Sequence, residues 1–226
     1  MTMKAVPKRS KSALKAATSV LRVGLTGGIA TGKSVVAEVF RGEGAFVLDM
    51  DALGHSLMEP GSEAHREIRE AFGDQILARG GEIDRKKLGE AIFKDPAMRL
   101  RLNGILHPRI LAEERRLIAD FARKSPGGIV VTQAALLVEA GVQDAYDRLV
   151  VTHCGREDQL LRLQMRDGLS EQEALSRLEA QGEPRRKLEE ADYDIDTGGN
   201  LEETLNRARE VYACLRRDQQ SRTASN

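Results

Sequence analysis

Several residue types are scarce in this sequence, and their scarcity narrows the class of protein. The 226 residues include no tryptophan, only 4% aromatic residues and only two cysteines, Cys154 and Cys214. The two cysteines lack metal-ligand spacing, and a disulfide framework would be unusual in a chain of this size and composition. A reducing cytoplasm is the compartment that fits this cysteine usage best.

An excess of charge and long apolar runs are also missing. Lys plus Arg and Asp plus Glu both number 35, so the formal net charge is zero although 31% of the residues are charged. This balance creates no global field that would recruit nucleic acid or an anionic membrane. No stretch approaches the roughly eighteen consecutive apolar residues of a transmembrane helix. We therefore expect neither nucleic acid nor membrane as a partner. The protein is expected to be a monomer or weak homo-oligomer.

Residues 1–20 differ from the rest of the chain because they contain no acidic residue. The segment also lacks an apolar core of signal-peptide length. We interpret it as a disordered basic extension. An organelle transit peptide is the alternative, because it would share the basic, serine-containing composition. At the other end, the polar residues 216–226 are expected to form a flexible tail.

The sequence does contain a complete phosphate-loop motif. Residues 27–34 read Gly-Gly-Ile-Ala-Thr-Gly-Lys-Ser and directly follow the apolar run 21–25. Such a loop turns backbone N–H groups toward a polyanion, and its glycines let the main chain approach phosphate oxygens closely. Lys33 offers a cation for the outer phosphates, Ser34 offers a hydroxyl for Mg²⁺, and the following helix points its positive end at the ligand.

Five short apolar runs predict β-strands, and helical patterns lie between most of them. This alternation is typical of an α/β fold in which helices cover both faces of a parallel sheet. Ser170 with Glu173 and Asn200 with Glu203 form capping patterns that predict the starts of two helices. The predicted strands span residues 21–26, 45–48, 129–132, 148–152 and 193–195.

The gap between the second and third predicted strands is much longer than a usual crossover, at about eighty residues. Its pattern is largely helical, and an insertion over the carboxyl edge of a parallel sheet is where a second substrate would be received. We therefore predict a nucleotide-binding core of residues 21–50, 119–155 and 191–215. Residues 51–118 form the predicted helical, acceptor-binding insertion.

Residues 156–190 carry many basic side chains on predicted helical segments. Arg162 and Arg166 are four positions apart, so they lie on one face of a helix. Acidic residues are interspersed, and on spacing alone a solvated charged surface explains the run equally well. In a chain with a phosphate loop we favour a basic lid that closes over the transferring phosphates and excludes water.

Two carboxylates, Asp49 and Asp51, stand at the end of the second predicted strand. If the strand continued that far, its alternation would point both the same way. A carboxylate at this place can receive the proton of an acceptor hydroxyl or orient Mg²⁺ through water. Aspartate is also a good helix N-cap, and we expect one of the pair to have that role. Ser34, with Asp49 or Asp51 as a further candidate, is the predicted metal site.

His107 precedes Pro108 within the predicted helical insertion. Proline disfavours helical geometry in the residue before it, so we expect a bend at this point. A histidine at a bend can satisfy backbone groups or contact the acceptor, and the sequence leaves both roles open.

An ordered set of further segments extends the phosphate loop into a pattern that covers most of the chain. The set resembles the dephospho-CoA kinase family from Leu21 to about Leu215. A phosphate loop alone occurs in thousands of proteins, whereas the ordered set is far more selective. Its members are residues 24–29 and 32–34, Val47 to Asp51, Glu59-Pro60-Gly61, Ile83-Asp84-Arg85, Leu106 to Ile110, Leu136 to Glu139, Gln159 to Asp167, Ala191-Asp192 and Ile195-Asp196.

The resemblance implies a P-loop kinase-like fold, ATP and dephospho-CoA as substrates, and Mg²⁺ as cofactor. The implied reaction transfers the γ-phosphate of ATP to the ribose 3′-hydroxyl of dephospho-CoA, which completes CoA synthesis. The implied catalytic residues are Lys33, Asp51, Arg162 and Arg166. The implied ATP-binding residues are Gly27, Gly28, Ile29, Ala30, Thr31, Gly32, Lys33, Ser34 and Val35. The implied acceptor-binding residues are Asp51, His107, Pro108, Arg109 and Leu136.

Three positions depart from the family pattern. Ala135 stands where the family usually has proline, and Gln133 stands where an aspartate is common. Both lie on or just after the third predicted strand, so the resemblance implies no magnesium ligand there. Thr197-Gly198 replaces an asparagine-containing turn near the adenine, which concerns base contacts and leaves the phosphate chemistry untouched.

Two other classes of protein share part of the pattern. Another nucleotide or small-molecule P-loop kinase would have a similar loop, lid and acceptor lobe, and the insertion sequence decides against it. A regulatory GTPase is the alternative from a different class, because residues 51–54 fit D-x-x-G. That motif comes too soon after Ser34 for a switch loop, and the chain has no Asn-Lys-x-Asp guanine-binding motif.

Overall fold

The computed structural model describes residues 19–181 and 184–224, which form two compact units. The first unit, here called the sheet unit, holds the described residues up to Leu48 and from Phe121 onward. The second, the helical unit, comprises Asp49–Asp120. Residues 1–18 of the predicted basic extension lie outside the described part of the chain.

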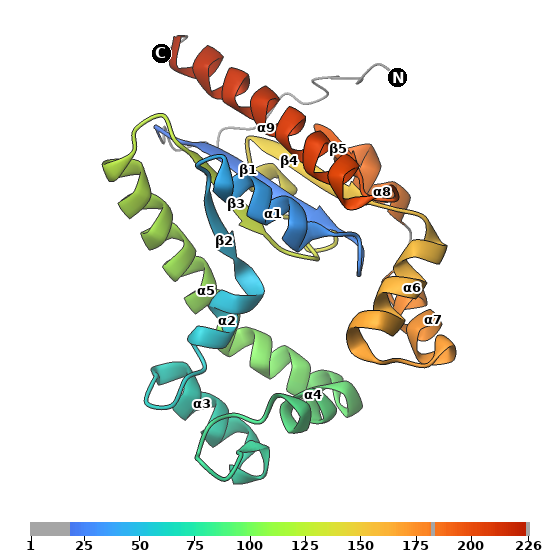
Figure 1. The fold of residues 1–226 in the computed structure, drawn as a ribbon. Coiled ribbons are helices and arrows are strands. Elements are labelled where there is room, and N and C mark those ends of the chain that lie inside the picture. Colours follow the sequence, from blue (N-terminus) through green and yellow to red (C-terminus); the bar gives the residue numbers. More distant parts are fainter. Residues whose placement is uncertain (1–18, 182–183, 225–226) are drawn as a thin grey trace. The chain divides into compact units, whose positions relative to one another are not determined.

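The sheet unit is built on a five-stranded parallel sheet in the order β2-β3-β1-β4-β5 (Figure 1). The central strand β1 pairs in parallel with β3 and β4, and β4 pairs in parallel with β5. The predicted α/β fold is confirmed, and each strand boundary lies within one residue of its prediction. The strands are β1 (Leu21–Gly27), β2 (Phe46–Asp49), β3 (Ile129–Gln133), β4 (Arg148–His153) and β5 (Tyr193–Asp196).

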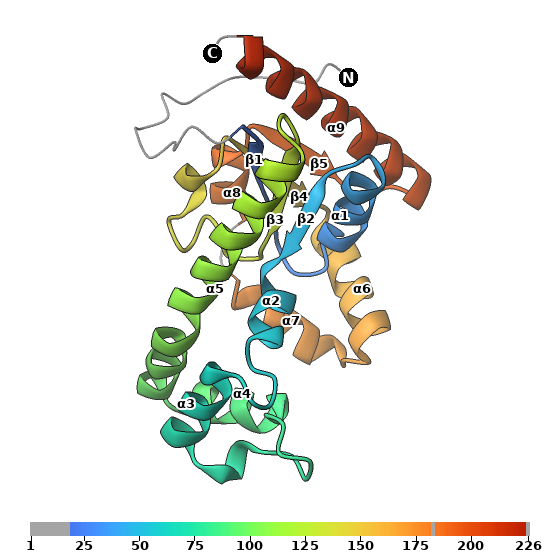
Figure 2. The same ribbon diagram turned by 90° about the vertical axis from the view of Figure 1, so that its left-hand side faces the viewer.

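Helices cover both faces of this sheet, as the near-continuous burial of β1, β3 and β4 requires. On one face α1 (Lys33–Gly42) and α9 (Leu201–Ala224) pack with fully buried Phe40 and Leu215 at the centre. α8 (Pro184–Glu190) lies on the other face, near a smaller cluster around Val138 and Leu149 (Figure 2). Burying each large apolar side chain stabilises the fold by about 1.5–3 kcal/mol. The unit also contains η2 (Gln143–Ala145), α6 (Arg156–Asp167) and α7 (Glu171–Glu179).

The two ends of the described chain are more ordered than the sequence predicts. The segment from residue 216 onward is the last part of α9, so the predicted flexible tail is wrong for residues 216–224. Gln219 is 4% exposed and donates to the Ser19 carbonyl at 3.1 Å, while Arg222 pairs with buried Asp147. Val20 is fully buried, so residues 19 and 20 are not part of a disordered segment. These partners lie 200 and 75 positions apart, and the local polar composition does not reveal them.

The helical unit has its own apolar core. Its elements are α2 (Met50–Ser56), α3 (Glu63–Phe72), η1 (Asp74–Ile76), α4 (Arg85–Lys94) and most of α5 (Pro96–Lys124). Ile68, Phe72 and Ile76 are buried against Leu102 and Leu106 of α5. None of the helices in the described residues is both long enough and apolar enough to cross a membrane.

α5 is helical along its whole length, Pro108 included. The expectation that His107 leaves helical geometry is therefore wrong, and His107 is an exposed residue in mid-helix. Proline removes one backbone hydrogen bond from a helix interior. Leu102 and Leu106 before the proline and Ile118 after it are buried, so packing on both sides holds the two halves helical.

Candidate active site

The phosphate loop connects the central strand to the first helix of the sheet unit. β1 ends at Gly27 and α1 begins at Lys33, with Gly32 as its N-cap at φ 75° in the left-handed region. A side chain at residue 27 would overlap the backbone and hydroxyl oxygens of Thr152. The loop therefore depends on glycine at residue 32 for its conformation and at residue 27 for close approach to β4.

Buried threonines fix the inner part of the loop. The Thr31 hydroxyl donates to the Gly28 carbonyl at 2.8 Å and lies 2.8 Å from the Thr152 hydroxyl. The Thr197 hydroxyl donates to the Thr31 carbonyl at 3.1 Å. Thr152 and Thr197 are each 1% exposed, at the carboxyl ends of β4 and β5. The parallel strands thus hold the loop in one conformation before any nucleotide contact is made.

The two side chains predicted to act on phosphate and metal lie in the first turn of α1. The Lys33 ammonium donates to the carbonyls of Gly27 at 3.0 Å and Gly28 at 2.7 Å. Ser34 is exposed beside it. The helix N-terminus adds a partial positive charge at the same place, so the loop is suited to an anion.

Side chains of α6 and of the turn after α7 hold the outer part of the loop. The Gln159 amide donates to the Ile29 carbonyl at 2.7 Å, and Gln181 accepts from the Ile29 N–H at 2.5 Å. The Arg162 guanidinium donates to the Ala30 carbonyl at 3.2 Å and to the Thr197 carbonyl at 2.5 Å. The structure therefore places Arg162 at the phosphate loop, where the sequence predicted a lid cation.

Arg166, the other predicted lid cation, lies in a different environment. Its side chain is 61% exposed and pairs with Asp167 at 2.7 Å, and Arg177 pairs with the same carboxylate at 3.3 Å. The hydrogen bond from Arg166 lowers the pKa of Asp167 below its usual value. The structure does not bring Arg166 to the loop together with Arg162, and its role at the phosphates stays a prediction.

Sequence reasoning missed the roles of Gln159 and Gln181 at the loop and of Lys187 beside the segment after β3. Lys187 is 4% exposed and bonds to the Ala135 carbonyl and to Glu139, both at 2.8 Å. It thereby ties α8 to the segment after β3, in which the predicted acceptor residue Leu136 is 54% exposed. Single glutamines and lysines carry no motif, so only the folded chain identifies them.

The structure assigns different positions to the two aspartates after β2. Asp49 caps α2 and accepts from the backbone N–H groups of Asp51 at 2.9 Å and Ala52 at 3.0 Å. The prediction that one of the pair is a helix cap is confirmed. Asp51 lies in the first turn of α2 and is exposed, so the strand does not extend far enough to align the two side chains.

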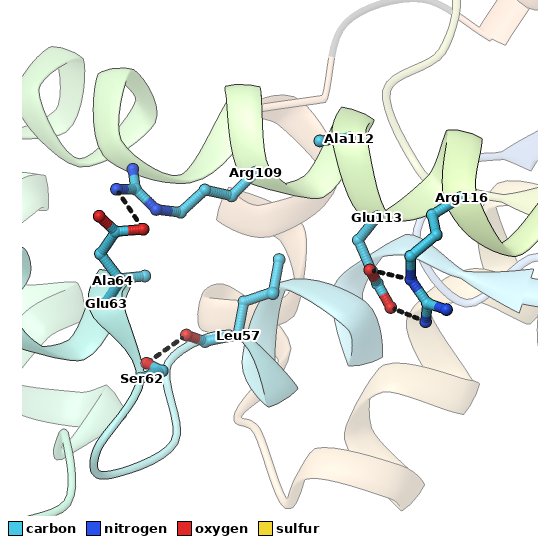
Figure 3. Close-up of a pocket in the computed structure, with 8 residues that line it drawn as sticks. All are labelled: Leu57, Ser62, Glu63, Ala64, Arg109, Ala112, Glu113 and Arg116. Atoms are coloured by element: carbon cyan, nitrogen blue, oxygen red, sulfur yellow. Dashed lines mark hydrogen bonds and ion pairs between the residues drawn. The ribbon is translucent and has the colours of Figure 1, made fainter.

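The helical unit contains a pocket of about 330 Å³ (Figure 3). At its rim Arg109 pairs with Glu63 at 3.5 Å, as well as with Glu67 at 2.6 Å, and Arg116 pairs with Glu113 at 2.6 Å. The buried Nε of Arg109 has no hydrogen-bond partner among the described residues. Because the rim charges neutralise each other, the pocket suits a ligand arm that is largely uncharged. The lining residues are Leu57, Ser62, Glu63, Ala64, Arg109, Ala112, Glu113 and Arg116.

The described residues contain no cluster of three or more His, Cys, Asp or Glu side chains that could hold a metal ion. Mg²⁺ does not require one, because it is commonly bound by one or two protein oxygens together with substrate phosphates and water. The exposed Ser34 hydroxyl is a protein oxygen of this kind.

A phosphate loop between the central strand and first helix of a parallel 2-3-1-4-5 sheet defines a P-loop kinase.

A family model described as dephospho-CoA kinase matches residues 21–203. The dephospho-CoA kinase of Syntrophotalea carbinolica is 44% identical over 87% of this chain and 92% of its own length. That of Geobacter sulfurreducens is 45% identical over 84% of this chain and 96% of its own length. The crystal structure of TT1252 from Thermus thermophilus matches with a TM-score of 0.74 and 30% identity, over 86% of this chain and 97% of that one. The chain belongs to the dephospho-CoA kinase family, a family of phosphotransferases.

Proposed function

We propose that the protein transfers the γ-phosphate of ATP to the ribose 3′-hydroxyl of dephospho-CoA, the last step of CoA biosynthesis. The observation that carries the proposal is a preorganised phosphate loop in a chain of this family. The loop supplies the phosphoryl site, and membership of the family supplies the acceptor.

The nucleotide side of the reaction needs charge neutralisation and alignment more than covalent chemistry. In our proposal the Lys33 ammonium exchanges its two loop carbonyls for the outer phosphates of ATP. Arg162 keeps the Ala30 carbonyl turned away from the ligand, so that loop N–H groups are directed to the phosphates. Arg166 is assigned to the transferring phosphate as a second cation.

Mg²⁺ bound to the nucleotide would supply further neutralisation of the β- and γ-phosphates. We assign the Ser34 hydroxyl as its protein ligand, because Ser34 stands next to Lys33 in the exposed first turn of α1. Asp49 and Asp51 are candidates for contact through water.

The acceptor side depends on Asp51. As the bond from the γ-phosphorus to the ADP oxygen breaks, a bond to the ribose 3′-oxygen forms, and the hydroxyl proton passes to the Asp51 carboxylate. A carboxylate is a weak base, so its main task is to orient the hydroxyl until the proton moves late in the reaction. The side chain of Asp51 is exposed, as contact with a second substrate requires.

The helical unit is assigned to the rest of the acceptor. Leu57 of the pocket directly follows α2, and at 1.5 Å per residue it lies about 9 Å along the helix axis from Asp51. The diphosphate and pantetheine arm of dephospho-CoA is longer than this, so a ribose held at Asp51 leaves the arm within reach of the pocket. His107, Pro108 and Arg109 of α5 and Leu136 of the sheet unit are the other proposed acceptor contacts.

A panel of acceptors offered with labelled ATP tests the proposal. We expect strong labelling of dephospho-CoA, and phosphorus NMR of the product should place the new phosphate on the 3′-oxygen. Labelling of a nucleoside monophosphate or another small alcohol, with none of dephospho-CoA, would instead support a different P-loop kinase.

We propose that the enzyme works in the cytoplasm, as a monomer or weak homo-oligomer.

A further inference from the structure

Two glutamines hold opposite sides of Ile29 in the phosphate loop. Gln159 of α6 donates to the Ile29 carbonyl, and Gln181, two residues after α7, accepts from the Ile29 N–H. A Cβ on residue 28 would lie 3.0 Å from the Gln159 amide nitrogen and 3.7 Å from the Gln181 oxygen. The first distance is tighter than an ordinary contact and the second is a normal van der Waals contact, so glycine at residue 28 makes room for Gln159 in particular.

The Gln181 contact lies at the end of the loop that receives the outer phosphates. The peptide unit between Gly28 and Ile29 offers its carbonyl to the Lys33 ammonium at 2.7 Å and its N–H to Gln181 at 2.5 Å. The lysine of a phosphate loop reaches the β- and γ-phosphates. The N–H that Gln181 occupies is therefore next to the site of the outermost phosphate.

We propose that Gln181 competes with the outermost phosphate of the nucleotide for the Ile29 N–H, so that a triphosphate releases Gln181 from the loop and a diphosphate does not. An amide oxygen and a phosphate oxygen are both hydrogen-bond acceptors. A single backbone N–H forms a good hydrogen bond with only one acceptor at a time. The charged phosphate oxygen forms the stronger hydrogen bond, so it displaces the neutral amide. The inference rests on the proposed function only in taking ATP as the nucleotide.

Gln159 has a different role because it holds the carbonyl of the same residue. That carbonyl and the Ile29 N–H belong to different peptide units, so the Gln159 bond does not use the donor that the phosphate needs. Gln159 is 8% exposed and stays in place as a positioning residue. Gln181 is the member of the pair that reports whether a triphosphate is bound.

Equilibrium binding of ADP and of a non-hydrolysable ATP analogue tests this competition. Removal of the competitor in Gln181→Ala should lower the Kd for the ATP analogue about three- to tenfold, the range of one hydrogen bond. The Kd for ADP should change less than about twofold. Gln181→Met, which keeps the length of the side chain, should behave like Gln181→Ala. Gln181→Glu keeps the acceptor but repels the phosphate, so it should weaken binding of the ATP analogue.

Gln172→Ala is the matched control, because Gln172 is an exposed glutamine of α7 in the same segment. It should leave both dissociation constants unchanged. Weaker binding of the ATP analogue by Gln181→Ala and Gln181→Met would overturn the proposal, since Gln181 would then contact the bound nucleotide. Equal tightening for ADP and the ATP analogue, or no change for either, would also overturn it.

These binding measurements contain no acceptor. If dephospho-CoA failed as an acceptor while Gln181→Ala tightened the ATP analogue selectively, the proposed acceptor would be wrong and the competition would stand. The reverse combination would remove the competition and leave the proposed function intact.

Discussion

The sheet unit and the helical unit hold their candidate site residues in different ways. In the sheet unit the phosphate loop is bound by side chains from β4, α6 and the turn after β5, such as Arg162 and Thr197. In the helical unit Asp51 and His107 are exposed, and neither side chain has a hydrogen-bond or ion-pair partner among the described residues. Substitutions of the buried residues that bind the loop, such as Thr197, should therefore disturb folding and binding together, whereas those of the exposed Asp51 and His107 should affect the reaction with little change in stability.

The largest effect on stability is expected for Asp147→Ala in the sheet unit. Asp147 is 4% exposed, accepts from the Arg22 N–H at 2.9 Å and pairs with Arg222 of α9. The Arg222 side chain is 23% exposed, so the loss of the hydrogen bonds to the Asp147 carboxylate should cost about 1.5–3 kcal/mol. Chemical denaturation should show this loss in the free energy of unfolding. Glu210→Ala, an exposed position of α9, should change it by less than about 0.5 kcal/mol, and an equal small change for Asp147→Ala would contradict the expectation.

Asp51→Asn tests whether a substitution at an exposed site residue of the helical unit affects the reaction without affecting stability. If the carboxylate positions the acceptor hydroxyl and receives its proton, turnover should fall at least about a hundredfold. The Kd for ATP and the free energy of unfolding should stay close to those of the wild type, because Asp51 is exposed. Steady-state kinetics and nucleotide titration measure these quantities. Glu90→Gln, another exposed carboxylate of this unit, is the control, and unchanged turnover in Asp51→Asn would remove Asp51 from the mechanism.

Arg109→Ala asks whether the pocket of the helical unit binds the acceptor. Loss of a hydrogen bond from a charged donor should raise the KM for dephospho-CoA about tenfold and leave kcat nearly unchanged. Arg115→Ala provides an exposed arginine of the same helix as the control. Because Arg109 also pairs with Glu67, a denaturation curve must accompany the kinetics. An unchanged KM would exclude Arg109 from acceptor binding.

The smallest expected effect is a pH dependence of stability at the edge of the sheet unit. The hydrogen bond with Asp194 raises the pKa of His153 above its usual value, with Asp196 adding to and Arg207 opposing the shift. The same bond lowers the pKa of Asp194. The His153 contribution is fully present below pH about 6.5 and is lost as pH rises through the raised pKa. The Asp194 contribution is present above pH about 4 and is lost as pH falls through the lowered pKa.

Unfolding experiments on His153→Gln as a function of pH test this predicted pH dependence of stability. The pair is partly exposed, so the stability difference from wild type should be less than about 1 kcal/mol, largest near pH 5–6 and smaller at pH 8. A difference that grows toward pH 8 would contradict the assignment.

Much of the fold could be predicted because its signals are local. The apolar runs locate all five strands, and the capping box of Ser170 with Glu173 forms as its residues predict. Asn200 likewise accepts from the Glu203 N–H at 2.9 Å at the start of α9. Each of these signals involves residues within a few positions of one another, where propensity and capping decide the structure.

The predictions that failed concern residues whose structure is decided by tertiary contacts and not by their sequence neighbours. Residues 216–224 look like a flexible tail by composition, but Gln219 and Arg222 bond to Ser19 and Asp147. The helix through Pro108 is the same kind of case, because burial along α5 outweighs the local preference of proline.

The sequence by itself determined the class of this protein. The spacing of Gly27 to Ser34 predicts a phosphate loop, and the alternation of strands with helices predicts a parallel sheet. Both signals depend on residues that are close together in the sequence. Only the tertiary structure decided which side chains hold that loop. Gln159, Arg162 and Gln181 reach it across 130, 132 and 152 positions of sequence, and hydrogen bonds over such distances leave no local pattern.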